Sequence, residues 1–277
     1  MRLFLVPIST RRAFVYCRSP NVLNASLLDK VTAKAAETWE KWERADKGWR
    51  KTLVSYGHVV LQRIPYEEWG LKSIPPLSAQ RQIEETRERK PVDVVFPRNA
   101  IKPENVLGIL SKLGTERQDH HRRKLWWSIG LAPLTLPIAV IPLVPNIPFF
   151  YLAYRGWSHW RALSGSRHLV YLHEKGLLHP QSSPELENFY SKRLISGRQE
   201  HGNEKSVVPL GEEDTEERLL LEESDGKELG EILGAPEIAI EVERAVVQIR
   251  QKLHSEQDAS VQGKGTRGSN TSKEKEL

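Results

Sequence analysis

The residues best suited to chemistry lie in an aromatic segment just past the middle of the chain. Tyr151, Arg155 and His159 are spaced four residues apart, so a helix would align them on one stripe. A histidine that can be protonated beside a fixed arginine could serve a proton pathway. The alternative is an anchor, in which the neighbouring tryptophans form an aromatic belt and arginines such as Arg161 reach lipid headgroups. We favour the anchor.

The element that must position these residues is an apolar run that ends at the same segment. Leu125–Tyr154 holds 30 residues without a single Asp, Glu, Lys, Arg or His, whereas about 18–20 apolar residues suffice for a membrane span. The proline cluster Pro142–Pro148 interrupts any α-helix there. Two layouts fit: a proline-bent hairpin with both ends on one side of a membrane, or one bent span followed by an interfacial helix. Basic residues on both flanks favour the hairpin.

Asn146 lies within the proline cluster and completes a set of candidate residues. We expect contact with membrane, partner or ion pathway from these five: Asn146, Tyr151, Arg155, His159 and Arg161. The run contains no acidic residue that could couple ion movement to a proton.

No pattern of an enzyme or a cofactor site occurs elsewhere in the chain. Gly-rich phosphate loops are absent, and Cys17, the single cysteine, excludes cysteine-based metal sites and intramolecular disulfides. Asp119, His120 and His121 are adjacent, so they would point to different helix faces, and we interpret them as a solvated polar stretch. We therefore expect no catalytic residue, no metal and no cofactor. A lipid-handling enzyme remains a less favoured hypothesis.

Charge is divided unevenly along the 277 residues. Residues 1–124 carry 24 Lys and Arg against 14 Asp and Glu, whereas residues 201–277 carry 10 against 18. This division predicts a basic body that meets an anionic surface, with an acidic tail held apart. Basic and acidic residues alternate within the body and match no nucleic-acid-binding module, so we expect no nucleic acid as a partner.

The fold class we predict is mainly α, in three regions. Residues 1–115 form a basic, α-rich region with a few short strands, including a long amphipathic helix over Ser26–Val60. Residues 116–198 hold the proline-kinked membrane helical hairpin and the helices after it. Residues 199–277 form an acidic, largely disordered tail with an amphipathic helix near residues 236–254. The first thirty residues fit either a strand hairpin or a mitochondrial leader.

Three segments together resemble a known family. They are Met1–Arg12 (MRLFLVPISTRR), Pro145–Tyr151 (PNIPFFY) and Trp157–Ala162 (WSHWRA). They are similar to the fungal family of mitochondrial potassium/proton exchange-related proteins, over roughly residues 1–200. The resemblance implies a mitochondrial, inner-membrane protein connected with potassium/proton exchange, and it implies no catalytic residue.

The residues limit what this resemblance can mean. An autonomous antiporter needs several spans with ionisable groups near the midplane, and this chain offers two short arms. We therefore expect a subunit, assembly factor or regulator of exchange, with anionic membrane lipids and other membrane proteins of an exchange complex as partners. A homo-oligomer is also compatible. The rival hypothesis is a membrane-tethered adaptor or scaffold without a direct transport role.

Overall fold

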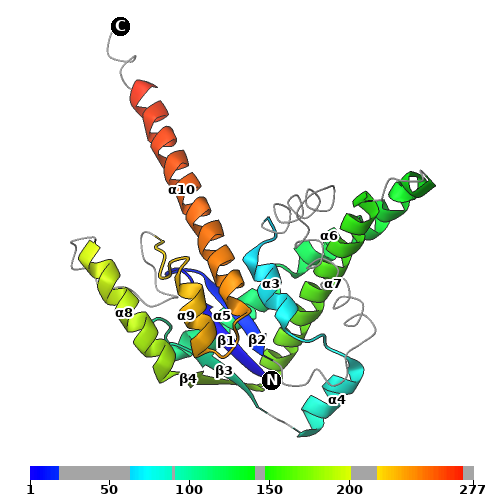
Figure 1. Cartoon of the computed structure of the whole chain (residues 1–277), viewed down its shortest axis with the longest axis horizontal. Coiled ribbons are helices and arrows are strands. Elements are labelled where there is room, and N and C mark those ends of the chain that lie inside the picture. Colours follow the sequence, from blue (N-terminus) through cyan, green and yellow to red (C-terminus); the bar gives the residue numbers. More distant parts are fainter. Residues whose placement is uncertain (19–62, 89–90, 141–146, 201–216, 271–277) are drawn as a thin grey trace, which may run out of the picture. The chain divides into compact units, whose positions relative to one another are not determined.

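The computed structural model describes residues 1–18, 63–88, 91–140, 147–200 and 217–270. The helix expected over Ser26–Val60 and the candidate Asn146 lie outside these residues. The described elements, shown in Figure 1, are β1 (Arg2–Pro7), β2 (Ala13–Arg18), α3 (Tyr66–Ser73), α4 (Ala79–Glu88), β3 (Val92–Phe96), α5 (Pro103–Thr115), α6 (Gln118–Leu131), the 3-10 helix η1 (Ala132–Val140), α7 (Ile147–Glu174), β4 (Leu178–Ser182), α8 (Pro184–Glu200), α9 (Asp225–Ile232) and α10 (Ile238–Asn270).

Four strands form one mixed sheet in the order β2-β1-β3-β4. The central strands β1 and β3 run parallel, with Leu3 opposite Val94. Both strands are apolar almost throughout and buried along most of their length, which is typical of strands covered on both faces. Residues 2–18, for which the sequence allowed a strand hairpin or a leader, thus form two strands of the sheet.

The chain divides into two compact units. The first comprises Met1–Leu5, Val15–Val95 and Leu107–Gln181, and the second comprises Val6–Phe14, Phe96–Val106 and Ser182–Leu277. The two are described separately.

In the first unit, the long helix α7 packs against both α3 and α6. Its approach to the end of α3 depends on Gly165, because a Cβ at this position would lie 2.0 Å from the carbonyl oxygen of Leu71. The Ser166 hydroxyl donates to the carbonyl oxygen of Gly114, at 2.7 Å, and ties α7 to α5. Small residues therefore let α7 lie close to its neighbours.

The predicted membrane hairpin is wrong. Within the described residues, no helix combines the length and the apolar character that crossing a membrane requires. The described part of the apolar run Leu125–Tyr154 is not one continuous helix, because it belongs to the end of α6, the proline-containing η1 and the start of α7. Helix α7 then carries Arg155 and His159 into a buried polar cluster. The fold is instead predominantly helical with a four-stranded mixed sheet.

The second unit corrects the prediction of a largely disordered acidic tail for residues 217–234. Ser9 pairs with Leu219 in an antiparallel bridge, and the Arg12 guanidinium lies 3.2 Å from the Glu217 carboxylate. Helix α9 packs on α10, as Figure 1 shows, and Leu229 is fully buried. Residues 217–234 contain few apolar side chains. These suffice to order the segment because it packs on other parts of the second unit and needs no core of its own.

Gly165 gives the first testable prediction. Replacing it with alanine forces a methyl group onto the Leu71 carbonyl, so we expect the free energy of unfolding to fall by about 3 kcal/mol or more. The matched control is Gly108→Ala on α5, where an added Cβ meets nothing within 4 Å and should stabilise by about 0.5–1 kcal/mol through helix propensity. Urea unfolding of the two variants checks this. Equal stability of both would show that the α3–α7 approach is not as close as described.

Candidate functional site

A cluster of ionisable side chains is buried where α3, α6 and α7 meet in the first unit. Helix α3 contributes Glu68 and Lys72, one turn apart, and α6 contributes His121. Helix α7 contributes Arg155, Ser158 and His159 from consecutive turns of the same face. Ionisable groups are rarely buried unless they are paired, so the contacts within the cluster decide what it can do.

Glu68 is the centre of the cluster, and its side chain is only 2% exposed. Arg155 holds the carboxylate with both terminal nitrogens: Nη1 lies 2.9 Å from Oε1 and Nη2 lies 3.3 Å from Oε2. The Ser158 hydroxyl donates to Oε1 at 2.5 Å and accepts from Lys72 Nζ at 3.1 Å. The two-pronged arginine–carboxylate geometry adds both energy and geometric specificity to an ion pair.

These contacts keep Glu68 ionised. Burial by itself raises the pKa of a carboxyl group, but here the Ser158 hydrogen bond and the Arg155 charge outweigh it. The pKa of Glu68 therefore lies below its usual range. At neutral pH the cluster holds a carboxylate and a guanidinium that neutralise each other.

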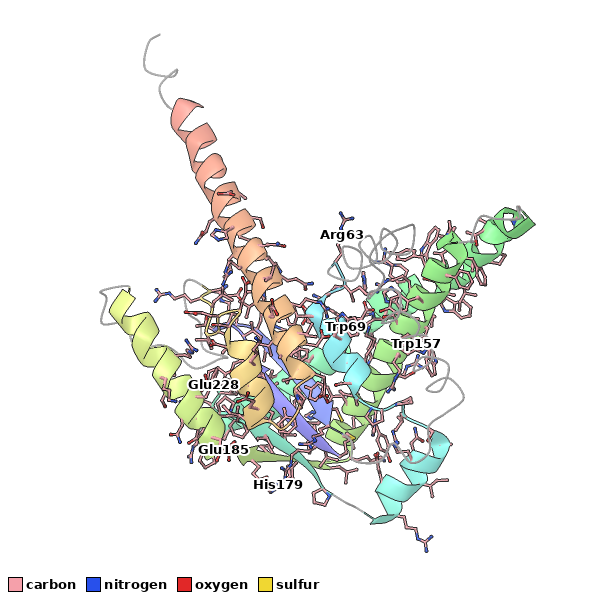
Figure 2. The ribbon with its side chains drawn as sticks, in the orientation of Figure 1. Arg63, Trp69, Trp157, His179, Glu185 and Glu228 are labelled. Carbon is pink, nitrogen blue, oxygen red and sulfur yellow. The ribbon has the colours of Figure 1, made fainter. Side chains whose placement is uncertain are left out.

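Lys72 adds a second cation to the cluster. Its ammonium group lies 3.3 Å from the centre of the Trp69 ring, a cation–π contact that compensates in part for lost hydration. Trp69 lies on α3 and Trp157 on α7, the two helices that carry most of the cluster (Figure 2).

The two histidines extend the cluster from α7 to α6. Arg155 Nη2 lies 3.0 Å from His159 Nε2. Because a guanidinium only donates, His159 Nε2 must accept and the ring proton must sit on Nδ1. His159 Nδ1 lies 3.1 Å from His121 Nδ1, so His121 accepts there and carries its own proton on Nε2. That Nε2 atom is buried and has no hydrogen-bond partner among the described residues.

Both histidines are held neutral at physiological pH. Burial is the main cause, and it lowers the pKa of His121 and of His159 to about 4, with the nearby Arg155 charge acting in the same direction. The Glu68 carboxylate opposes this shift without reversing it. A group with a pKa near 4 gains and loses protons poorly around pH 7, so the cluster is suited to joining helices rather than to relaying protons.

Three side chains of the cluster also have the arrangement of a metal site. Glu68, His121 and His159 each offer a ligand atom, and these atoms lie within 4.8 Å of one another. Their types suit a transition metal. However, Arg155 already occupies both Glu68 oxygens and the outer nitrogen of His159. With Lys72 also present, a divalent cation would enter a site where positive charge already exceeds negative, so we assign no metal to it.

The five candidate residues that were predicted from the sequence do not form one site in the structure. Arg155 and His159 lie together in the cluster. Arg161 lies elsewhere on α7, where its Nη1 donates to the Ile74 carbonyl at 3.2 Å. Tyr151 is exposed near the start of α7. Asn146 lies outside the described residues.

Sequence reasoning missed four members of the cluster: Glu68, Lys72, Ser158 and His121. The interpretation of His121 as a solvated residue was wrong, because its side chain is buried against His159. The acidic partner that the apolar run lacks comes from α3, 87 residues before Arg155. Glu68 directly follows another glutamate, Glu67, and nothing in the local sequence marks it as the buried one of the two. Only pairing between distant segments would have revealed it.

The histidines predict a pH dependence of stability. Their ordinary pKa of 6.5 falls to about 4 on folding, so between these values the unfolded chain binds more protons. The free energy of unfolding should then decrease as pH falls from 6.5 to 4, by at most about 1.4 kcal/mol per pH unit for each histidine. Urea unfolding across this range measures the slope.

The control for this prediction uses one buried and one exposed histidine. His121→Gln should make the slope shallower, whereas substitution of the exposed His179 (Figure 2) should leave it unchanged. An identical slope in the His121→Gln variant would contradict the assignment.

Comparisons with known proteins agree with the resemblance noted from the sequence. The sequence model of the family described as "Mitochondrial K+-H+ exchange-related" matches residues 2–173. An uncharacterized protein of Schizosaccharomyces pombe is 30% identical over 189 residues, covering 68% of this chain and 81% of the relative. An uncharacterized protein of Saccharomyces cerevisiae is 29% identical over 202 residues, covering 63% of each chain.

No solved structure matches the chain. The family match spans every residue of the buried cluster, from Glu68 on α3 to His159 on α7. The chain belongs to the mitochondrial K+-H+ exchange-related family.

Proposed function

We propose that this protein is an accessory component of mitochondrial potassium/proton exchange, acting at the inner membrane as a subunit, assembly factor or regulator. Family membership supports the connection with exchange and with mitochondria. The distinction between an accessory component and the exchanger itself rests on the buried cluster.

The observation that carries this distinction is the state of the buried ionisable groups. An exchanger couples potassium to protons through a group that changes protonation near the working pH. In the cluster, Glu68 is locked in its pair with Arg155, and the pKa of His159 is lowered to about 4. Such groups hold a fixed protonation state at neutral pH, which suits a structural role.

The experiment is potassium-acetate swelling of isolated mitochondria, which reports exchange directly. Mitochondria that lack the protein should swell more slowly, and the wild-type chain should restore the rate. His159→Gln should restore it equally, because the histidine relays no proton. Gly165→Leu, whose side chain has no room beside Leu71, serves as the misfolded control, and immunoblots confirm the protein level of each variant.

Purified protein in liposomes completes this test. With a pH-sensitive dye inside the vesicles, the chain alone should give no potassium-dependent proton movement. Exchange by the chain alone would show an autonomous antiporter and overturn the accessory role. Unchanged swelling of mitochondria lacking the protein would remove the link with exchange and favour the adaptor hypothesis.

A further inference from the structure

Large apolar side chains are exposed at the end of the α6–α7 pair. We call this surface the tip, and it comprises Trp126, Trp127, Ile129, Leu131, Leu134, Phe150 and Tyr151. Trp126 is 67% exposed, Leu134 is 72% exposed and Phe150 is 65% exposed. The tip is formed by the last turns of α6, the start of η1 and the first turn of α7, which lie at the same end of the two packed helices (Figure 1).

The exposure of the tip does not come from loose packing of these helices. Ser128 on α6 is buried, and a Cβ added at Gly156 of α7 would lie 3.4 Å from the Ser128 Cβ. Small residues therefore close the α6–α7 interface while the two tryptophans beside Ser128 point away from it. An exposed apolar surface of this kind on a packed element indicates a binding site.

A basic turn lies directly before the tip. Arg122, Arg123 and Lys124 are all exposed on α6. The nearby acidic residue, Asp119, is exposed, and its Oδ1 lies 3.3 Å from Arg122 Nη2. Positive charge thus dominates this turn.

Two adjoining surface hollows join the basic turn to the apolar tip. One, of about 320 Å³, is lined by Asp119, His120, Arg122, Arg123 and Trp126. The other, of about 510 Å³, is lined by Arg123, Trp126, Trp127, Gly130 and Leu131. Arg123 and Trp126 line both, so the surface changes from cationic to apolar along the helix axis. A phospholipid has the same order, from phosphate to acyl chain.

The length of this gradient limits how deep the tip can reach. From Arg123 to Leu131, eight residues of α-helix rise about 12 Å, whereas the hydrocarbon core of a bilayer is about 30 Å thick. Apolar groups of interfacial segments enter the headgroup and acyl boundary by about 5–10 Å. Tryptophan prefers this depth, since its ring is amphipathic. A gradient of this length fits contact with one leaflet.

We propose that the tip is an interfacial binding surface for an anionic phospholipid bilayer. Arg122, Arg123 and Lys124 bind lipid phosphates, and Trp126 and Trp127 lie at the boundary between headgroups and acyl chains. This deepens the proposed function, on which it rests for the inner-membrane setting, by naming the surface that contacts the membrane.

The test is flotation of the full-length protein with vesicles of phosphatidylcholine alone or mixed with phosphatidylglycerol. The protein should float with the mixed vesicles and bind far more weakly to the neutral ones. High salt should weaken the binding, because the phosphate contacts are screened. Lipids brominated on the acyl chain should quench tryptophan fluorescence less in the Trp126→Ser/Trp127→Ser variant.

Matched variants assign the binding to the tip. Each lost cation lowers membrane partitioning about fivefold, so Arg122→Gln/Arg123→Gln/Lys124→Gln should bind about a hundredfold more weakly. Trp126→Ser/Trp127→Ser should lose at least about tenfold, because two interfacial anchors are removed. The controls change exposed residues elsewhere, and both should bind as the wild type does: Arg98→Gln/Arg167→Gln/Lys175→Gln and Ile83→Ser/Ile240→Ser.

Three outcomes would overturn the proposal. The first is equal binding to neutral and anionic vesicles, and the second is equal binding by the tip variants and the control variants. In the third, the wild-type protein binds no vesicle but associates with itself, and Trp126→Ser/Trp127→Ser abolishes this self-association. The last would show that a second copy covers the tip. The two proposals can fail separately, because they are measured in different assays. Loss of vesicle binding would be seen with purified protein and would not affect the link with exchange. Loss of that link would be seen as unchanged swelling of mitochondria and would not affect binding to vesicles.

Discussion

A carboxylate and a guanidinium that are buried together must stay together, and this constraint governs the first unit. Removing either one leaves the other as an uncompensated buried charge, at a cost of about 3–5 kcal/mol. Glu68, whose side chain is 2% exposed, and Arg155, whose side chain is 16% exposed, approximate such a pair between α3 and α7. The pair fixes the position of the two helices, and through His159 it extends to α6. The close approach at Gly165 is the steric counterpart of this electrostatic link.

Burial is the main cause of the low pKa of the two histidines, and one member of the pair, Arg155, acts in the same direction. Arg155 donates to His159 and disfavours a second positive charge on that ring, while burial favours the neutral form of both imidazoles. Arg155 and His159 suggest a proton relay when α7 is considered alone. Their contacts with Glu68 on α3 and His121 on α6 instead suit them to hold the three helices together. The surface that we propose to bind a membrane lies outside the cluster, at the exposed end of α6 and α7.

Elements with strong local signals could be predicted from the sequence. The run Val92–Phe96, rich in β-branched residues and followed by a proline, forms β3. Helix α5 begins at Pro103, a residue favoured at the first helical position, and ends one residue past Gly114. The apolar run Leu125–Tyr154 led to the wrong prediction of a membrane hairpin, because its average hydrophobicity does not show whether the run is one continuous helix. Its described part belongs to α6, η1 and α7, and none of these helices is both long and apolar enough to cross a membrane.

Only two of the six cluster residues could be predicted from the sequence. Arg155 and His159 share a helix, so their spacing brought them together. Glu68 and His121 come from other helices, and their burial depends on tertiary contacts that no local pattern encodes. The fold of residues 217–234 was missed for a similar reason, because its sparse apolar residues are buried against other segments of the second unit.

A double-mutant cycle on Glu68 and Arg155 tests the central claim most directly. Urea unfolding of Glu68→Gln, Arg155→Met and the double variant gives the coupling free energy between the two side chains. We predict that each single variant loses about 3–5 kcal/mol and that the double variant loses much less than the sum. The more exposed pair of Glu67 and Arg117, 2.7 Å apart, should show a coupling of about 1 kcal/mol or less. Additive losses at Glu68 and Arg155 would contradict the account, because the two side chains would then stabilise the fold independently.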